Sequence, residues 1–330
     1  MRDFWRGRRV LVTGHTDLKG ASLCLWLEQR GAEVSALALA PDTRPALYDI
    51  LGPWTGQAQG ETDIRDLPAL AARVAAARPQ VVLHLAAHAL VRSSHTQPAE
   101  TFARNAMGIV NLLAALRHAP DLEAVVIATS DKVYANAGAG RPFVEDDRFG
   151  GKEPYSVSKA CAELAADSFH VRFFTAGNAT GCGDGAAERL EPDFVPALAA
   201  GVPLRRSRPA AVRPWQHVLA PLAGGLDLTE ALASQPAAAP QAVNFGPDPD
   251  SFASLAAVAE ALGRAFDGAI PHLPAPGPHP PEASTLRLPS DRAAQALSWS
   301  ANRYRSHRDG ADMRAFTLAQ IAAYEERLGQ

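Results

Sequence analysis

The chain has 330 residues, of which 47% are hydrophobic and 20% are charged, so it can bury a large core without disulfides or a structural metal. Its formal net charge is -3 and it contains no long run of Lys or Arg, which argues against a surface that tracks nucleic-acid phosphates or an anionic membrane. We therefore expect its partners to be small molecules and other copies of the same chain, with no nucleic acid and no membrane.

The cysteines and the N-terminal segment bear on the cellular compartment. Cys24, Cys161 and Cys182 are scattered, without Cys-x-x-Cys or Cys/His spacing, which fits a reducing compartment and predicts no zinc site. The charged segment 1–9 runs directly into a strand-like segment and does not resemble a signal peptide, and no apolar run has membrane-spanning length. We expect a cytoplasmic protein.

Short apolar segments alternate with helical stretches through the first half of the chain. Strands are predicted at residues 10–13, 33–39, 81–86 and 124–129, with helices at 21–30 and 67–77. Continuous apolar strands separated by helices are typical of right-handed βαβ units, whose parallel sheet is covered on both faces. The sequence thus predicts a doubly wound α/β fold.

The pattern changes after about residue 180. Further strands are predicted at 171–174 and 242–245, a loop or linker in the proline-rich stretch 271–281, and a closing helix at 313–328. We expect one domain over residues 1–180, to which a strand near 242–246 returns, and a smaller lobe over residues 181–330 that is interleaved with it.

A glycine-rich turn, Gly14-His15-Thr16-Asp17-Leu18-Lys19-Gly20, follows the first predicted strand. Glycines at a strand-to-helix turn let the backbone approach a pyrophosphate at the helix N-terminus, so the first domain is expected to bind a dinucleotide. Asp17 stands where a Gly-x-x-Gly-x-x-Gly spacing requires glycine, and its charge repels the phosphates unless the side chain turns outward and caps the helix. An ordinary glycine-bounded turn is the alternative. The expected contacts are Gly14, Thr16, Asp17, Leu18 and Gly20.

Residues after the other predicted strands are further candidates for cofactor contacts. Asp63 can accept hydrogen bonds from an adenine amine, although a helix N-cap explains it equally well. Asp42 favours the ribose of NAD and Arg44 the 2′-phosphate of NADP, so this segment leaves both cofactors open. His84 and His88 have no third ligand spaced near them, and no metal site is predicted. The remaining cofactor candidates are Ile64, Leu85, Ala86, Ala87 and Asn105.

Tyr155 and Lys159 form a Tyr-x-x-x-Lys pair downstream of a second polar segment. On a helix these residues share a face, so the Lys159 ammonium can favour the ionised form of the Tyr155 phenol, a base for a sugar hydroxyl. A solvated pair on a surface helix is the alternative, because the spacing is common. The hydroxyl of Thr129, at a predicted strand end, is expected to hold the same sugar oxygen.

Asp131 and Lys132 add a carboxylic acid beside an amine. Such a couple provides a proton donor and a proton acceptor in one place, which the elimination of water across two neighbouring carbons requires. A charged turn is the alternative.

With these motifs the chain resembles an extended short-chain dehydrogenase/reductase, which has a Rossmann-type NAD-binding domain, and within that superfamily it is most similar to the CDP-glucose 4,6-dehydratases. The blocks Ser-Asp-Lys-Val-Tyr and Arg-Pro-Trp-Gln-His-Val are the specific ones. The segments that carry the resemblance are FWRGRRVLVTGHTDLKG (4–20), HLAAHALVRSS (84–94), NAMGIVNLLAA (105–115), TSDKVY (129–134), EDDRFGGKEPYSVSKACAEL (145–164), AGNATGCGD (176–184), RPWQHVLAPLAG (213–224) and NFGPD (244–248).

The resemblance implies an internal redox cycle on NAD. Tyr155, helped by Lys159 and Thr129, would take the proton of the glucosyl 4-hydroxyl while NAD accepts hydride. Lys132 would then remove the proton on carbon 5 and Asp131 would protonate the departing 6-hydroxyl. Return of hydride to carbon 6 would give CDP-4-keto-6-deoxyglucose, a compound of deoxysugar biosynthesis.

The resemblance also implies contacts to the nucleotide sugar and a dimer. Asn178, Arg213 and His217 would hold the substrate, with Arg213 as a clamp on the diphosphate. The helices that follow Asn105 and Tyr155 would pair in a homodimer, and a higher homo-oligomer is the alternative.

Several departures from the family pattern keep other functions open. Thr175 stands where the family commonly has Arg, Gly185 stands where a Trp usually follows, and the connection into strand 171–174 is short, so the preceding helix must end early. The alternatives are a 4-epimerase or reductase, which needs Tyr155 and Lys159 alone, and a catalytically impaired homologue that binds nucleotide sugars.

Overall fold

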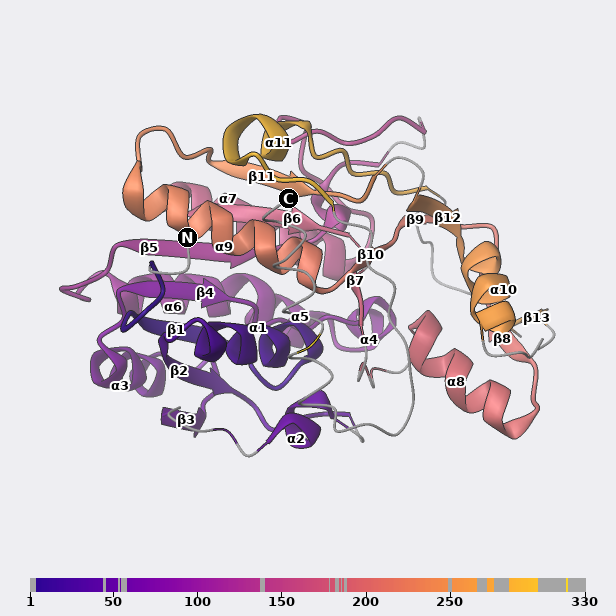
Figure 1. Ribbon diagram of the computed structural model, residues 1–330, viewed down its shortest axis with the longest axis horizontal. Coiled ribbons are helices and arrows are strands. Elements are labelled where there is room, and N and C mark those ends of the chain that lie inside the picture. The colour runs from indigo at the N-terminus through magenta and orange to yellow at the C-terminus, as the bar shows by residue number, and fades with distance from the viewer. Residues whose placement is uncertain are drawn as a thin grey trace.

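A parallel sheet of seven strands forms the centre of the computed structural model (Figure 1). The structure describes residues 4–43, 46–52, 54, 58–136, 140–177, 179–181, 184, 186, 189–248, 251–265, 272–275, 285–301 and 319. The strand order is β11-β6-β5-β4-β1-β2-β3, and every pair is parallel. The strands are β1 (Arg9–Thr13), β2 (Glu33–Ala38), β3 (Ala58–Glu61), β4 (Val81–His84), β5 (Ala124–Ala128), β6 (Arg172–Ala176) and β11 (Ala242–Phe245). The doubly wound prediction is confirmed.

Helices cover both faces of the sheet. One face packs against α1 (Leu18–Gln29), α2 (Leu47–Leu51), α9 (Leu219–Ser234) and α11 (Asp291–Leu297); the other packs against α3 (Leu67–Ala77), α6 (Gly108–Leu116) and α7 (Pro154–Ser168). Successive side chains on a strand point to opposite faces, so Val10 and Val12 join the first core and Leu11 joins the second. Burying one such side chain stabilises the folded state by about 1.5–3 kcal/mol. Because both faces of the sheet are buried, each central strand is a continuous apolar run in the sequence.

The segment between β4 and α6 crosses the carboxyl edge of the sheet. It contains α4 (Val91–Thr96), α5 (Pro98–Phe102) and a π-helical turn (Ala103–Met107), and a short 3₁₀ turn (Asp131–Val133) follows β5. These pieces bring polar residues from two loops to the edge where open α/β sheets bind ligands.

The helix α7 begins at a side-chain cap and ends in a tight turn. The Glu153 carboxylate accepts hydrogen bonds from the backbone N–H groups of Tyr155 (2.8 Å) and Ser156 (3.0 Å). At the other end, His170 adopts a left-handed conformation (φ 56°) and Val171 N–H donates to Ala166 O at 2.9 Å. The short connection into β6 is therefore made by this turn, and the helix continues to Ser168.

A smaller region beside the sheet contains α8, α10 and short strands (Figure 1). Its core contains Leu190, Phe194, Leu204 and Ala259. The strands pair β7 with β10, β9 with β12 and β8 with β13. The bounds are β7 (Ala179–Thr180), α8 (Leu190–Ala200), β8 (Leu204–Arg206), β9 (Val212–Pro214), β10 (Gln216–His217), β12 (Phe252–Ser254), α10 (Leu255–Ala265) and β13 (His272–Pro274).

The proline-rich stretch 271–281 differs in part from the prediction of a loop. His272–Pro274 forms β13, an edge strand of a two-stranded sheet, which is a position where proline is tolerated because one side of the strand needs no partner. Residues 271 and 276–281, and the predicted helix 313–328 apart from Ala319, lie outside the described residues. In the part of the chain that is described, no helix has both the length and the apolar character needed to cross a bilayer.

Candidate active site

A cavity of about 290 Å³ lies at the carboxyl edge of the sheet, between it and the smaller region. Its walls come from the turn after β1, the loop after β4, the end of β5, α7 and the segment around β8 and β9. The structure thus brings together residues that are far apart in the sequence. The site residues predicted above that line it are Gly14, Asp17, Leu18, Gly20, Leu85, Ala87, Thr129, Asp131, Lys132, Tyr155, Lys159 and Arg213.

The glycine turn has the close backbone approaches that a dinucleotide cradle needs. Gly14 has φ +80°, and a Cβ there would lie 2.6 Å from the backbone nitrogen of Ala86. A Cβ on Gly20 would lie 2.1 Å from the carbonyl oxygen of Gly14. No side chain fits at either position, so the turn keeps bare backbone beside the N-terminus of α1, as pyrophosphate binding requires.

Asp17 is exposed and occupies the N-cap position of α1, but its side chain makes no capping hydrogen bond. The alternative in which this carboxylate is occupied by capping the helix is therefore not realised. Lys19 and Arg189 line the same cavity, and the charge of Asp17 favours the protonated form of both, raising their pKa values against the effect of burial. The carboxylate therefore has cations nearby that partly offset its charge.

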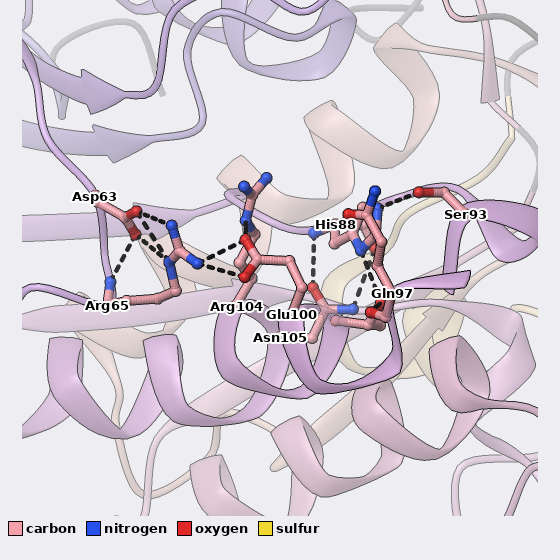
Figure 2. Close-up of polar contacts among 9 residues, drawn as sticks. Asp63, Arg65, His88, Ser93, Gln97, Glu100, Arg104 and Asn105 are labelled. Carbon is pink, nitrogen blue, oxygen red and sulfur yellow. Dashed lines mark hydrogen bonds and ion pairs between the residues drawn. The ribbon is translucent and has the colours of Figure 1, made fainter. Parts of the chain in front are cut away.

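Asp63 belongs to a chain of ion pairs that continues through Arg65 and Glu100 to Arg104 (Figure 2). Its carboxylate accepts from the backbone N–H and Nε of Arg65, both at 2.9 Å, and this hydrogen bonding lowers the pKa of Asp63. Asp63 is not the N-cap of α3; that residue is Asp66, whose side chain accepts from Ala69 N–H at 3.0 Å. An adenine contact of Asp63 stays a prediction.

Three other cofactor candidates have internal partners. Thr16 Oγ1 donates to Leu39 O at 3.0 Å, and Ile64 is buried against Gly108. Asn105 accepts from the backbone N–H of His88 at 2.7 Å and donates to its carbonyl oxygen at 3.1 Å (Figure 2). These side chains shape the loops around the cavity, and neither they nor Ala86 are among the described residues that line it.

Tyr155 and Lys159 are both buried at the floor of the cavity. Burial raises the pKa of Tyr155 to about 12, and a hydrogen bond with Ser130 acts in the opposite direction. Burial lowers the pKa of Lys159 to about 8, and its ammonium donates to Ala128 O at 3.5 Å. The expected lowering of the Tyr155 pKa by Lys159 is thus not seen: desolvation of the phenolate has the largest effect, and the cation whose charge lowers this pKa is Arg189.

The hydroxyl that hydrogen-bonds Tyr155 is that of Ser130. Thr129 also lines the cavity, and its expected contact with the sugar oxygen stays a prediction. Thr129 Oγ1 donates to Glu163 Oε1 and also lies 3.2 Å from Phe174 O. The sequence offered both, without a signal to choose between them.

Asp131 and Lys132 meet Tyr155 at the cavity. Asp131 is 3% exposed; its Oδ1 accepts from Ser130 Oγ at 3.2 Å, and its Oδ2 has no hydrogen-bond partner within the described residues. Burial raises the pKa of this carboxyl, which favours the protonated acid. Lys132 Nζ lies 5.9 Å from the centre of the Tyr155 ring. An acid, an amine and a phenol therefore surround one space.

The residues predicted to contact the substrate differ in their position relative to the cavity. Arg213 is buried and lines the cavity, and its charge lowers the pKa of Asp131 against the larger effect of burial. His217 is not among the described lining residues; its Nδ1 accepts from Leu219 N–H at 3.2 Å at the start of α9, and burial lowers its pKa to about 4. Asn178 and Gly185 lie outside the described residues.

Residues 10–218 match the model of the NAD dependent epimerase/dehydratase family. The chain belongs to this family. It is 36% identical over 313 residues to the CDP-glucose 4,6-dehydratase of Salmonella typhimurium, covering 90% of this chain and 87% of that one. It is 35% identical over 164 residues to the dTDP-glucose 4,6-dehydratase of Streptomyces griseus, covering 47% of this chain and 48% of that one.

Solved structures share the fold of this NAD-dependent epimerase/dehydratase. DesIV, a dTDP-glucose 4,6-dehydratase from Streptomyces venezuelae with NAD bound, superposes with a TM-score of 0.77 at 22% identity, covering 97% of this chain and 98% of that one. MoeE5 in complex with UDP-glucuronic acid and NAD gives a TM-score of 0.75 at 23% identity, covering 96% and 99%. The predicted family and its NAD cofactor are confirmed, and the glycine cradle fits that cofactor. Among the described residues, no three His, Cys, Asp or Glu side chains gather as a metal site.

Proposed function

We propose that this protein is a nucleotide-sugar 4,6-dehydratase that acts on CDP-glucose in the cytoplasm, as an enzyme of deoxysugar biosynthesis. The observation that carries the proposal is the meeting of Asp131, Lys132 and Tyr155 at one cavity beside the glycine cradle. Redox chemistry at a sugar hydroxyl needs NAD with Tyr155 and Lys159, but no second acid and base. The added acid and amine are what the loss of water requires.

The side chains divide the proton transfers among themselves. Bound NAD supplies the acceptor and donor of hydride. Tyr155, hydrogen-bonded to Ser130, takes the proton of the 4-hydroxyl, and Lys132 takes the proton from carbon 5 once the 4-ketone has made it acidic. Asp131, whose pKa is raised by burial, gives its proton to the departing 6-hydroxyl.

The cavity also suits an anionic substrate. Arg92, Arg208 and Arg213 line it, and Arg213 is buried, so the cavity has guanidinium groups that can pair with a diphosphate. The cytidine base is proposed from the Salmonella relative, whose name gives CDP-glucose and which matches most of this chain.

The test is to incubate the purified protein with NAD and CDP-glucose and to measure the chromophore that a 4-keto sugar develops in alkali. The same assay with dTDP-glucose and UDP-glucose separates the sugar chemistry from the choice of base. Turnover of dTDP-glucose alone would change the proposed substrate and leave the proposed mechanism unchanged. No 4-keto product from any of the three would overturn the proposal.

We also propose a homodimer through α6 and α7. Leu164 on α7 is 55% exposed and Met107, directly before α6, is 53% exposed, which leaves apolar side chains on the helices that would pair. A Leu164→Glu variant is expected to shift the protein toward monomer in size-exclusion chromatography with light scattering, while its circular dichroism is unchanged.

A further inference from the structure

A second polar cluster lies beneath the floor of the cavity, between α7 and the ends of β5 and β6. It consists of Glu163, Thr129 and Thr175, and we call it the Glu163 cluster. All three side chains are buried, and Glu163 is 0% exposed. Buried carboxyls are rare in proteins unless they are paired or have a role, and the chemistry proposed above makes no use of this one.

The hydrogen bonds of Glu163 hold one of its oxygens and leave the other without a partner. Oε1 accepts from Thr129 Oγ1 and from Thr175 Oγ1, the latter at 3.0 Å, and the two hydroxyls are 3.1 Å apart. Oε2 is buried and has no hydrogen-bond partner in the described part of the chain. The carboxyl is therefore fixed in orientation by residues of two strands, with half of its acceptor capacity unused.

Lys159 is the nearby cation on the same helix. Lys159 and Glu163 are four residues apart on α7, a spacing that places them on one face, and Lys159 is 5% exposed. The hydrogen bond that the ammonium makes to Ala128 O is long, at 3.5 Å. The two groups are thus a buried base and a buried acid on one face of the helix, with Tyr155 one turn further toward the N-terminus.

We propose that Glu163 is a positioning residue for the reaction, whose anchored carboxylate keeps Lys159 in the charged form that Tyr155 needs. This inference rests on the proposed function for the role of Tyr155 and Lys159. The charge coupling between Glu163 and Lys159 can be tested without it.

The pKa directions agree with this coupling. Burial raises the pKa of Glu163 to about 7 and lowers that of Lys159 to about 8, so each group is pushed toward its neutral form. The two charges act against this: Lys159 lowers the pKa of Glu163, and Glu163 raises that of Lys159. Loss of the Glu163 carboxylate is therefore expected to lower the pKa of Lys159, so that a smaller fraction of Lys159 is charged at a given pH.

The other groups packed around the pair do not replace Glu163. His84 of β4 has a pKa lowered to about 3 by burial and is neutral, and the charge of Lys19 from α1 disfavours the Lys159 ammonium. Tyr134, after β5, has a raised pKa and donates to Asn244 of β11 at 2.7 Å, so it stays neutral. Among the described residues, Glu163 is the group whose charge favours the Lys159 ammonium.

The test measures the pKa of Lys159 directly. The chain has four lysines, at 19, 132, 152 and 159, so carbon-13 labelling at lysine Cε gives a spectrum with few signals, and Lys159→Arg assigns the relevant one. In the wild-type protein, Lys159 should titrate well below the ordinary lysine value of 10.5. In Glu163→Gln, the midpoint of Lys159 should fall by about one pH unit or more, as expected for loss of a nearby opposite charge.

A matched variant separates charge from structure. Asp167→Asn makes the same chemical change at an exposed position one turn further along α7 and should leave the Lys159 midpoint unchanged. An unmoved midpoint in Glu163→Gln overturns the proposal. Glu163→Ala removes the same charge and is the second variant if Glu163→Gln does not fold; an unmoved midpoint there overturns the proposal in the same way.

The enzymatic arm tests the link to Tyr155. If the proposal holds, the alkaline limb of the kcat/KM profile for 4-keto sugar formation moves to lower pH in Glu163→Gln by the shift seen for Lys159. A uniform loss at every pH indicates a purely structural role and overturns it. If the wild-type protein forms no 4-keto sugar while the Lys159 shift is present, the proposed function fails and the charge coupling stands.

Discussion

Two strand-to-helix junctions at the same sheet edge are built in opposite ways. At the junction from β5 to α7, the polar side chains are buried and bonded: Glu153 caps the helix, and Glu163 holds the hydroxyls of two strand ends. At the junction from β1 to α1, the backbone is shaped by Gly14 and Gly20, and Asp17 is exposed without a capping bond. The edge at α7, where the catalytic residues are proposed, is therefore shaped by side-chain hydrogen bonds, whereas the cofactor turn is shaped by glycine backbone. We expect that removing the Asp17 side chain disturbs the cofactor turn little.

The largest effect is expected at the catalytic edge, from Tyr155→Phe. Loss of a general base costs typically 10²- to 10⁴-fold in rate, so 4-keto sugar formation should fall by about that factor while NAD affinity is unchanged. Tyr134→Phe is the matched control. It leaves the Asn244 side-chain oxygen without its donor, costing roughly 1–3 kcal/mol of stability, but it should keep turnover. Equal loss of turnover in both variants would contradict the assignment of Tyr155.

The next effect separates dehydration from redox chemistry. In Lys132→Ala, the 4-keto-6-deoxy product should fall by about 10²- to 10³-fold, while the near-ultraviolet absorbance of reduced cofactor still develops with substrate. The exposed Lys152→Ala provides a control of the same type. A Lys132→Ala protein that keeps most of its turnover would point to a 4-epimerase or reductase.

The fold was largely predictable because its signals are local. Both faces of the sheet are covered, so each central strand is an apolar run that the sequence displays, and α3 (Leu67–Ala77) has the predicted bounds. Thr16 and Asn105 show the limit for side chains. Their partners, Leu39 and His88, lie on other elements, and the sequence could not say whether these polar groups face a ligand or the protein.

The sequence motifs predicted which residues line the candidate site, but not the directions in which their side chains point. Tyr155, Lys159 and Asp131 line the cavity as expected, since they follow from spacing and strand ends. Ser130 and Thr129 could not be told apart, because the choice depends on which way the strand end turns. Glu163 carried no signal of its own, and its burial follows from contacts with β5 and β6 that only the folded chain makes.

A smaller effect concerns stability and comes from the same catalytic edge. The pKa of Glu163 is raised in the folded protein to about 7 from 4.5, so folding favours its neutral form; this stability is present below about pH 4.5 and is lost as pH rises through 7. At pH 8 the ionised carboxylate costs on the order of 3 kcal/mol. Glu163→Gln should therefore be more stable than wild type in urea unfolding at pH 8, with a smaller difference at pH 5. Equal differences at both pH values would show that the carboxyl is not desolvated.

The smallest effect is expected at the cofactor turn, from Asp17→Gly. Removing an exposed carboxylate beside the pyrophosphate cradle should tighten NAD binding by about tenfold, or roughly 1.4 kcal/mol, measured by calorimetry. The substitution should change folding stability by only a few tenths of a kcal/mol, because glycine is a fair N-cap and no capping bond is lost.

Asp17→Asn keeps the size of the side chain and removes its charge, so it shows how much of the gain in NAD affinity comes from charge and how much from side-chain size. If charge dominates, Asn recovers most of the gain, and added salt strengthens NAD binding to the wild-type protein more than to Asp17→Asn, because salt screens the repulsion. If neither variant binds NAD more tightly, Lys19 and Arg189 already neutralise the carboxylate, and the cofactor turn is then held by side-chain charges as firmly as the catalytic edge is.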